Sequence, residues 1–238
     1  MRSTRLASLL AAMLVVTGCA SNQETATRPP DRPRAHPHPR AGCQPADGAL
    51  FVASHGGLFR LISSSVAGRS WRSVVLEGGA DLHVIRLGRE VFYAQNAHDD
   101  QLFEGAFGGS GLSQRTSQPG TTIDLAVDPR TDCRLFAATD RGVFVSDDRA
   151  RHWKRLDRRR TGLLVFAGRT LVMIDGGGGV SASSGLGRPW KSVGALPGRP
   201  AAVCSEQQGL LAATQDGRVY QSSDAGRRWS LRAGNPNR

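Results

Sequence analysis

The chain has 238 residues, with 31 Lys or Arg against 20 Asp or Glu, so its formal net charge at pH 7 is +11. A positive charge of this size favours anionic neighbours such as lipid headgroups or cell-wall polymers, although an Arg excess also fits a genome rich in G and C. No nucleic-acid-binding motif accompanies the charge, so nucleic acid is not an expected partner.

Residues 1–18 have the pattern of an export signal: two early Arg residues, the apolar run Leu6–Val16, and then small residues. The run is shorter than the roughly 20 residues that a membrane-spanning helix needs. The stretch Val16-Thr17-Gly18-Cys19 resembles the lipobox of bacterial lipoproteins, in which the Cys is acylated and becomes the first residue. This resemblance implies an extracytoplasmic protein that is lipid-anchored to a bacterial membrane through Cys19. The alternative is an ordinary secretory signal that contains a Cys.

The segment 19–47 is rich in Pro, Arg and Ala and has almost no large apolar side chain. Such a segment cannot bury enough surface to offset its ordering entropy, so we expect a disordered, semi-extended linker after the lipidated Cys. His36 and His38 in this tract are interpreted as spacer residues, and neither a metal nor a cofactor is expected.

From residue 48 to about residue 235, one pattern of four short strands returns roughly every 40 residues. The unit that ends near residue 157, for example, has strand patterns at 121–129, 134–140, 142–148 and 152–157. Four short strands in about 40 residues is the period of a β-propeller blade. We therefore predict an all-β fold, a β-propeller of about five four-stranded blades. An open arc and a six-bladed ring are the alternatives.

Two stretches, Ser146–Trp153 and Ser222–Trp229, share the pattern Ser-x-Asp-x-small-x-x-Trp. They resemble the Asp-box, or BNR repeat, of sialidases and sortilin-like receptors, which lies on the hairpin between strands three and four. The resemblance implies a structural role: Ser and Asp satisfy backbone N–H groups, Gly supplies a positive φ, and Trp folds back on the hairpin. The box residues are Ser146, Asp148, Trp153, Ser222, Asp224, Gly226 and Trp229. Degenerate copies are anchored by Trp71, Leu112 and Trp190, and should form looser hairpins because they lack the Asp.

The segments at 47–61, 80–88 and 123–129 resemble a family of bacterial exported BNR-repeat lipoproteins, often labelled sialidase-like or glycosyl-hydrolase-like. The likeness covers nearly the whole domain. Sialidases need an arginine triad, a Tyr–Glu nucleophile pair and an acid/base Asp. Alignment of the repeats places Tyr93 and Tyr220 in packing columns, so no catalytic residue is assigned.

The turns between strands two and three, together with the loops that enter each blade, should bring acidic and His side chains to one face of the disc. Asp is common in tight turns for conformational reasons alone. The functional alternative is a shallow acidic face that binds a cation or a basic partner. Its candidate residues are His55, Asp81, His83, His98, Asp99, Asp124, Asp140, Asp175 and Asp216.

Cys43 and Cys204 occupy equivalent positions in the first and last units. In a five-bladed ring these units are neighbours, and export permits oxidation, so a disulfide across the seam is possible.

The sequence as a whole favours a non-catalytic binding module of the cell envelope, similar in build to BNR-type assembly factors. We expect a monomer that contacts the membrane through its lipid and binds an envelope protein or polymer. The alternative is a carbohydrate-active protein, either a sialidase-like glycoside hydrolase or a lectin.

Overall fold

The computed structural model describes the strands at 40–41, 51–54, 57–61 and 71–75, and then residues 82–106, 112–206 and 208–234. Side chains are described from Leu82 onward, His83 excepted. Every regular element in these residues is a β-strand, which confirms the all-β prediction. The same residues contain no helix with the length and apolar character that crossing a membrane requires.

The strands pair antiparallel, each with the next along the chain, in four-stranded sheets that we call blades. Blade 1 contains β1 (Arg40–Ala41), β2 (Phe51–Ser54), β3 (Gly57–Leu61) and β4 (Trp71–Val75). Blade 2 contains β5 (Leu82–Leu87), β6 (Val91–Asn96), β7 (Leu102–Ala106) and β8 (Leu112–Arg115). Blade 3 contains β9 (Thr122–Val127), β10 (Leu135–Thr139), β11 (Gly142–Ser146) and β12 (Lys154–Asp157). Blade 4 contains β13 (Leu163–Ala167), β14 (Thr170–Ile174), β15 (Gly179–Ser183) and β16 (Lys191–Ala195). Blade 5 contains β17 (Pro200–Glu206), β18 (Gly209–Thr214), β19 (Val219–Ser222) and β20 (Ser230–Ala233).

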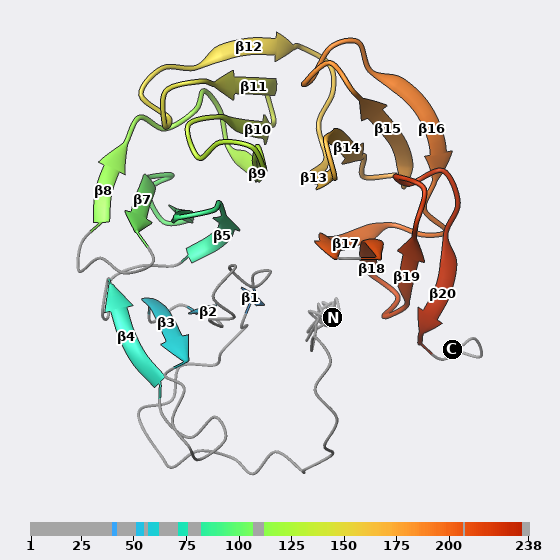
Figure 1. Ribbon diagram of the computed structural model, residues 1–238, viewed down its shortest axis with the longest axis horizontal. Coiled ribbons are helices and arrows are strands. Elements are labelled where there is room, and N and C mark those ends of the chain that lie inside the picture. The colour runs from blue at the N-terminus through green and yellow to red at the C-terminus, as the bar shows by residue number, and fades with distance from the viewer. Residues whose placement is uncertain are drawn as a thin grey trace, which may run out of the picture.

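The blades are arranged around a common centre as in a β-propeller, with the first strand of each blade innermost and the fourth at the rim (Figure 1). Consecutive blades meet through their inner strands, where β5 contacts β9, β9 contacts β13, and β13 contacts β17. Within the described residues, only blades 2 to 5 are full blades with their side chains in place. Blade 1 is described by its strands alone, and β1 has two residues. The prediction of about five regular blades therefore holds for four.

The innermost strand of blade 1 lies inside the segment 19–47 that the sequence predicts as a linker. Arg40 and Ala41 pair with Ala53 and Val52 of β2. The predicted signal peptide and the rest of the predicted linker lie outside the described residues, as do Cys19 and Cys43. The predicted pairing of Cys43 with Cys204 therefore stays a prediction.

Apolar side chains form clusters between consecutive blades. One cluster joins Val84 and Tyr93 of blade 2 to Leu125 and Leu135 of blade 3. A second joins blade 3 to blade 4, where the rings of Phe136 and Phe166 meet edge to face with centroids 5.8 Å apart. A third joins blade 4 to blade 5. Because each of these clusters draws on two blades, burial of apolar surface stabilises the junctions of blades 2 to 5 as well as each sheet.

Blade 3 shows that the two middle strands belong to the core and that the fourth strand lies at the rim. All five residues of β10 and of β11 are buried, whereas β12 is exposed or half-buried along its length. Gly142 begins β11 with a φ of 116°, where an added Cβ would lie 2.1 Å from the carbonyl oxygen of Asp157. The close approach of β11 and β12 therefore requires glycine at this position.

Candidate functional site

Asp140, Asp175 and Asp216 lie exposed in the turns between strands two and three of blades 3, 4 and 5. Each carboxylate bonds within its own blade. Asp140 accepts a hydrogen bond from the backbone N–H of Thr121 at 2.9 Å, and Asp175 accepts from the N–H groups of Gly177 and Gly179, both at 2.9 Å.

Asp216 shares its turn with two partners, the Thr214 hydroxyl and Arg218, whose Nη1 lies 3.0 Å from the carboxylate. The Thr214 hydrogen bond is the main cause that lowers the pKa of Asp216, followed by the charge of Arg218, against a raising effect of burial. The group therefore stays ionised near neutral pH. The three turn aspartates stabilise their turns and also present negative charge to solvent.

Of the remaining candidates for the acidic face, His98 and Asp99 are exposed in the turn between β6 and β7. Asp99 accepts from the backbone N–H of Gln101 at 3.1 Å. His55 and Asp81 lie outside the described residues, and the side chain of His83 is not described.

Asp124 does not belong to an open face, which corrects the prediction made for it. It lies on β9, is 1% exposed, and accepts hydrogen bonds from the backbone N–H groups of Leu125 and, in blade 4, Leu164. Its other partner is the guanidinium of Arg86 in blade 2. One buried carboxylate thus ties the inner strands of three consecutive blades together. A buried ionised group needs such partners.

The hairpins Ser146–Trp153 and Ser222–Trp229 share one hydrogen-bond pattern. Ser146 Oγ accepts from the N–H of Ala150 at 2.9 Å and donates to Asp148, which accepts in turn from the N–H of His152 at 2.9 Å. In blade 5, Ser222 accepts from Gly226 at 2.8 Å and donates to Asp224 at 2.9 Å. The Ser and Asp side chains therefore satisfy the N–H groups of a tight hairpin, as the sequence pattern indicates.

The third hairpin, Ser183–Trp190, keeps part of this pattern although it lacks the Asp. Ser183 Oγ accepts from the N–H of Gly187 at 3.0 Å, which is the bond that Ser146 and Ser222 make. Two consecutive residues of this hairpin, Leu186 and Gly187, have positive φ, and the corresponding residues of the two other hairpins do too. The hairpin therefore keeps its backbone conformation where the Asp is absent.

These hairpins also dock each blade onto the preceding one. Ala150 is fully buried in the cluster between blades 2 and 3, where Trp153 packs against the same residues. Trp190 and Trp229 pack against the next two clusters. Sequence reasoning placed each Trp on its own hairpin, and the contact with the neighbouring blade is the part that it missed. Trp153 Nε1 donates to the carbonyl oxygen of Thr116, at the end of blade 2, over 2.8 Å.

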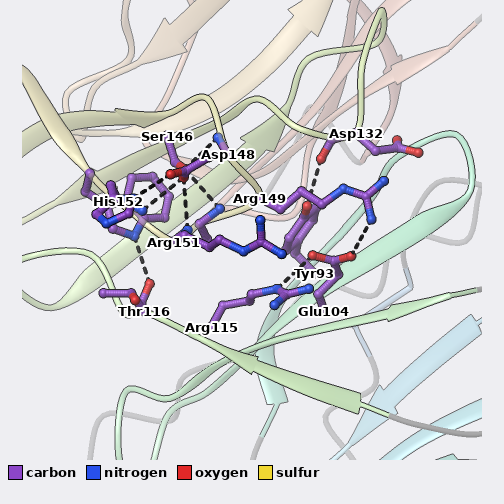
Figure 2. Close-up of polar contacts among 12 residues, drawn as sticks. Tyr93, Glu104, Arg115, Thr116, Asp132, Ser146, Asp148, Arg149, Arg151 and His152 are labelled. Carbon is purple, nitrogen blue, oxygen red and sulfur yellow. Dashed lines mark hydrogen bonds and ion pairs between the residues drawn. The ribbon is translucent and has the colours of Figure 1, made fainter.

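A polar cluster at the junction of blades 2 and 3 contains the residue types of a sialidase-like catalytic set (Figure 2). Tyr93 is fully buried, as its packing column predicts, and its hydroxyl donates to the carbonyl oxygen of Asp132 at 2.7 Å. Glu104, also buried, is paired with Arg115 at 2.9 Å and with Arg149 at 3.1 Å. Sequence reasoning missed Glu104 and both arginines, because Arg149 comes from the hairpin of the next blade.

The geometry of this cluster argues for a structural role. Burial, followed by the charge of Glu104, raises the pKa of Tyr93 well above its ordinary value of 10.0. A phenol that stays protonated is a poor nucleophile. The carboxylate of Glu104 is already paired with two guanidinium groups, so the cluster works as an ionic clamp between blades.

No family model matches the sequence, and no curated protein matches it. Among solved structures, a chain of a nidogen–laminin complex aligns with a TM-score of 0.65 at 14% identity, over 79% of this chain and 76% of that one. YCF48 bound to D1 peptide aligns with a TM-score of 0.50 at 15% identity, over 77% and 63%. A GH74 enzyme from Niastella koreensis aligns with a TM-score of 0.63 at 16% identity, over 82% and 37%. At these identities the comparisons show the β-propeller fold alone.

Proposed function

We propose that the protein is a lipid-anchored extracytoplasmic module whose propeller binds a partner in the cell envelope without catalysing a reaction. The lipobox-like stretch that ends at Cys19 supports the anchor, and the hairpins Ser146–Trp153 and Ser222–Trp229 support membership of the Asp-box propellers. The binding surface is the turn face, formed by the turns between strands two and three.

The observation that carries this proposal is where the Tyr and carboxylate side chains lie, either buried between blades or exposed in turns. Glu104 and Tyr93 are buried in the clamp between blades 2 and 3, and Asp124 is buried among three blades. The exposed carboxylates of Asp140 and Asp175 lie in turns where solvent surrounds them. General acid catalysis needs a carboxyl that is protonated near the working pH, and exposure favours the ionised form. These residues are suited to act through charge.

Two of the structural neighbours favour a protein partner. One belongs to a complex of nidogen with laminin, and YCF48 is bound to a D1 peptide. A propeller presents turns from several blades on one face, so a partner can contact several turns at once without any change in the scaffold. For this chain we expect a partner with a basic surface, because the turn face carries Asp140, Asp175 and Asp216.

The test is a crosslinking pull-down from native membranes with the full chain and with a triple variant. The variant carries Asp140→Asn, Asp175→Asn and Asp216→Asn, which keep an acceptor oxygen for each turn and remove the charge. We expect the wild type to capture a partner and the triple variant to capture at least about tenfold less, with the difference shrinking at high salt. Equal capture by the two chains would contradict the assignment of the turn face.

A matched control removes three exposed cations outside the turn face instead, through Arg89→Gln, Arg169→Gln and Arg232→Gln. This control should not reduce capture. The anchor is tested separately: Cys19→Ala should abolish labelling by an acyl-chain probe and release the protein from the membrane fraction.

The second candidate is a carbohydrate-active protein, which the likeness to the GH74 enzyme favours. This chain spans only 37% of that enzyme, so the comparison covers a part of it. Binding of the purified chain to a glycan array, with no protein captured from membranes, would support this second candidate.

A further inference from the structure

Exposed cations gather on the outer edge of blades 3 and 4. They lie on β12, on the loop that follows it, and on β16 with the hairpin before it. The exposed cations of this edge are Lys154, Arg155, Arg158, Arg159, Arg188 and Lys191. Within the described residues none of them pairs with a carboxylate. This edge does contain the carboxylate of Asp157, but that carboxylate is paired with Arg160 at 3.6 Å.

The two strands form one continuous edge because the hairpin of blade 4 lies on β12. The Nε of Arg188 donates to the carbonyl oxygen of Leu156 at 2.8 Å, and an added Cβ on Gly187 would lie 2.5 Å from the side chain of Leu156. In Figure 1, β12 and β16 follow one another along the rim of the disc. The cations therefore belong to one surface.

An open groove of about 570 Å³ lies in the middle of this edge. It is lined by Leu156, Asp157, Arg160, Arg188, Pro189 and Trp190. The indole N–H of Trp190 is buried and has no hydrogen-bond partner in the described part of the chain. The groove thus combines apolar side chains and a half-buried Trp with a border of guanidinium groups. Arg and Trp together are typical of surfaces that contact the headgroup region of a membrane.

We propose that the outer edge of blades 3 and 4 binds an anionic phospholipid surface. Four of the cations, Lys154, Arg158, Arg159 and Lys191, are long, exposed side chains with no described contact. Such side chains suit a fluid array of phosphate groups better than one shaped ligand. Contact along the rim would place the disc edge-on to the bilayer. The turn face would then stay open to the partner proposed above. This inference deepens the membrane anchoring proposed for Cys19, and its test omits the acyl chain so that the two can fail separately.

The test measures sedimentation of the unlipidated full chain, carrying Cys19→Ala, with two kinds of vesicle. One kind contains phosphatidylcholine alone and the other contains equal amounts of phosphatidylcholine and phosphatidylglycerol. The edge variant adds Lys154→Gln, Arg158→Gln, Arg159→Gln and Lys191→Gln, whose side chains make no described contact. We expect it to lose at least about a hundredfold in partitioning to the anionic vesicles, since each cation near such a surface contributes about 1 kcal/mol and tenfold corresponds to about 1.4 kcal/mol.

A charge-matched control carries Arg89→Gln, Arg169→Gln, Arg199→Gln and Arg232→Gln, four exposed cations that are not on β12, on the loop after it, or on β16 with its hairpin. It should bind anionic vesicles within about threefold of the parent chain, because its removed charges do not face the membrane. Equal losses in the two variants would overturn the proposal, since net charge alone would then explain binding. Binding to soluble polyphosphate with no preference for anionic vesicles would overturn it in favour of an anionic polymer.

Discussion

Ser146→Ala is the most direct probe of how the hairpins hold the blades together. The Ser146 side chain is 1% exposed, and its hydroxyl is the acceptor for the N–H of Ala150 at 2.9 Å. Ala150 is fully buried between blades 2 and 3, so water cannot replace the lost partner. A buried N–H without an acceptor costs about 1–3 kcal/mol. We expect Ser146→Ala to reduce the free energy of unfolding by that amount.

Ser183→Ala separates the contributions within the hairpin. Ser183 makes the same bond to the N–H of Gly187, but no Asp follows it to accept from its hydroxyl. Its loss should therefore cost less than the loss of Ser146, by about 0.5–1.5 kcal/mol for the additional bond to Asp148. The measurement is urea unfolding followed by Trp fluorescence, which reports on the blade junctions because Trp153 and Trp190 pack there. In a thermal unfolding experiment on the same variants, each kcal/mol lost should lower Tm by about 2–4 °C.

Ser192→Ala is the matched control, because Ser192 is exposed on β16. It should change stability by less than about 0.5 kcal/mol. If Ser146→Ala were no more destabilising than Ser192→Ala, the hairpin hydrogen bonds would not stabilise the blade junctions, and the structural reading of the repeat would be refuted.

Three further predictions follow from single side chains. Gly226→Ala should destabilise by about 1–3 kcal/mol in urea unfolding, because Gly226 has a φ of 87° and an added Cβ would lie 2.7 Å from the side chain of Val180; an unchanged midpoint would contradict this. Tyr93→Phe should cost about 1–2 kcal/mol, since it deprives the Asp132 carbonyl of its donor, and should leave partner capture unchanged. Burial raises the pKa of Asp128, but the two-point bond from Arg130 outweighs it and holds the pKa below 3.8. The stability from this pair is therefore present above pH 3.8 and lost as the pH falls through the lower folded-state pKa, a loss that Asp128→Asn should remove from the acid-unfolding profile.

The strands and hairpins could be predicted from the sequence because their signals are local. The Ser and the small residue four positions later in Ser146–Trp153 recur in Ser183–Trp190 and in Ser222–Trp229, and each set forms its bond within one hairpin. Alternating apolar residues likewise mark strands whose neighbours are adjacent in the chain. The short β1 gave no such signal, because two residues in a Pro-rich segment show no periodicity.

The contacts between blades could not be predicted, because they join residues a whole repeat apart. Glu104 meets Arg149 across 45 positions, and Asp124 bonds the N–H of Leu164 across 40. Asp124 stands near the start of the first strand of its repeat, next to the loop that enters the blade, yet the packing of three inner strands buries it. Placing such residues requires the arrangement of the blades, and pattern alone does not give it.

The central claim is that the propeller binds a partner in the cell envelope and does not hydrolyse a glycan. The most direct measurement is the release of reducing sugar by the purified chain from xyloglucan and from a sialylated oligosaccharide, with Glu104→Gln and the triple Asn variant in parallel. We predict no release above the buffer rate for any of the chains. Release by the wild type that is lost in Glu104→Gln, or in the triple variant while the fold is retained, would contradict the account.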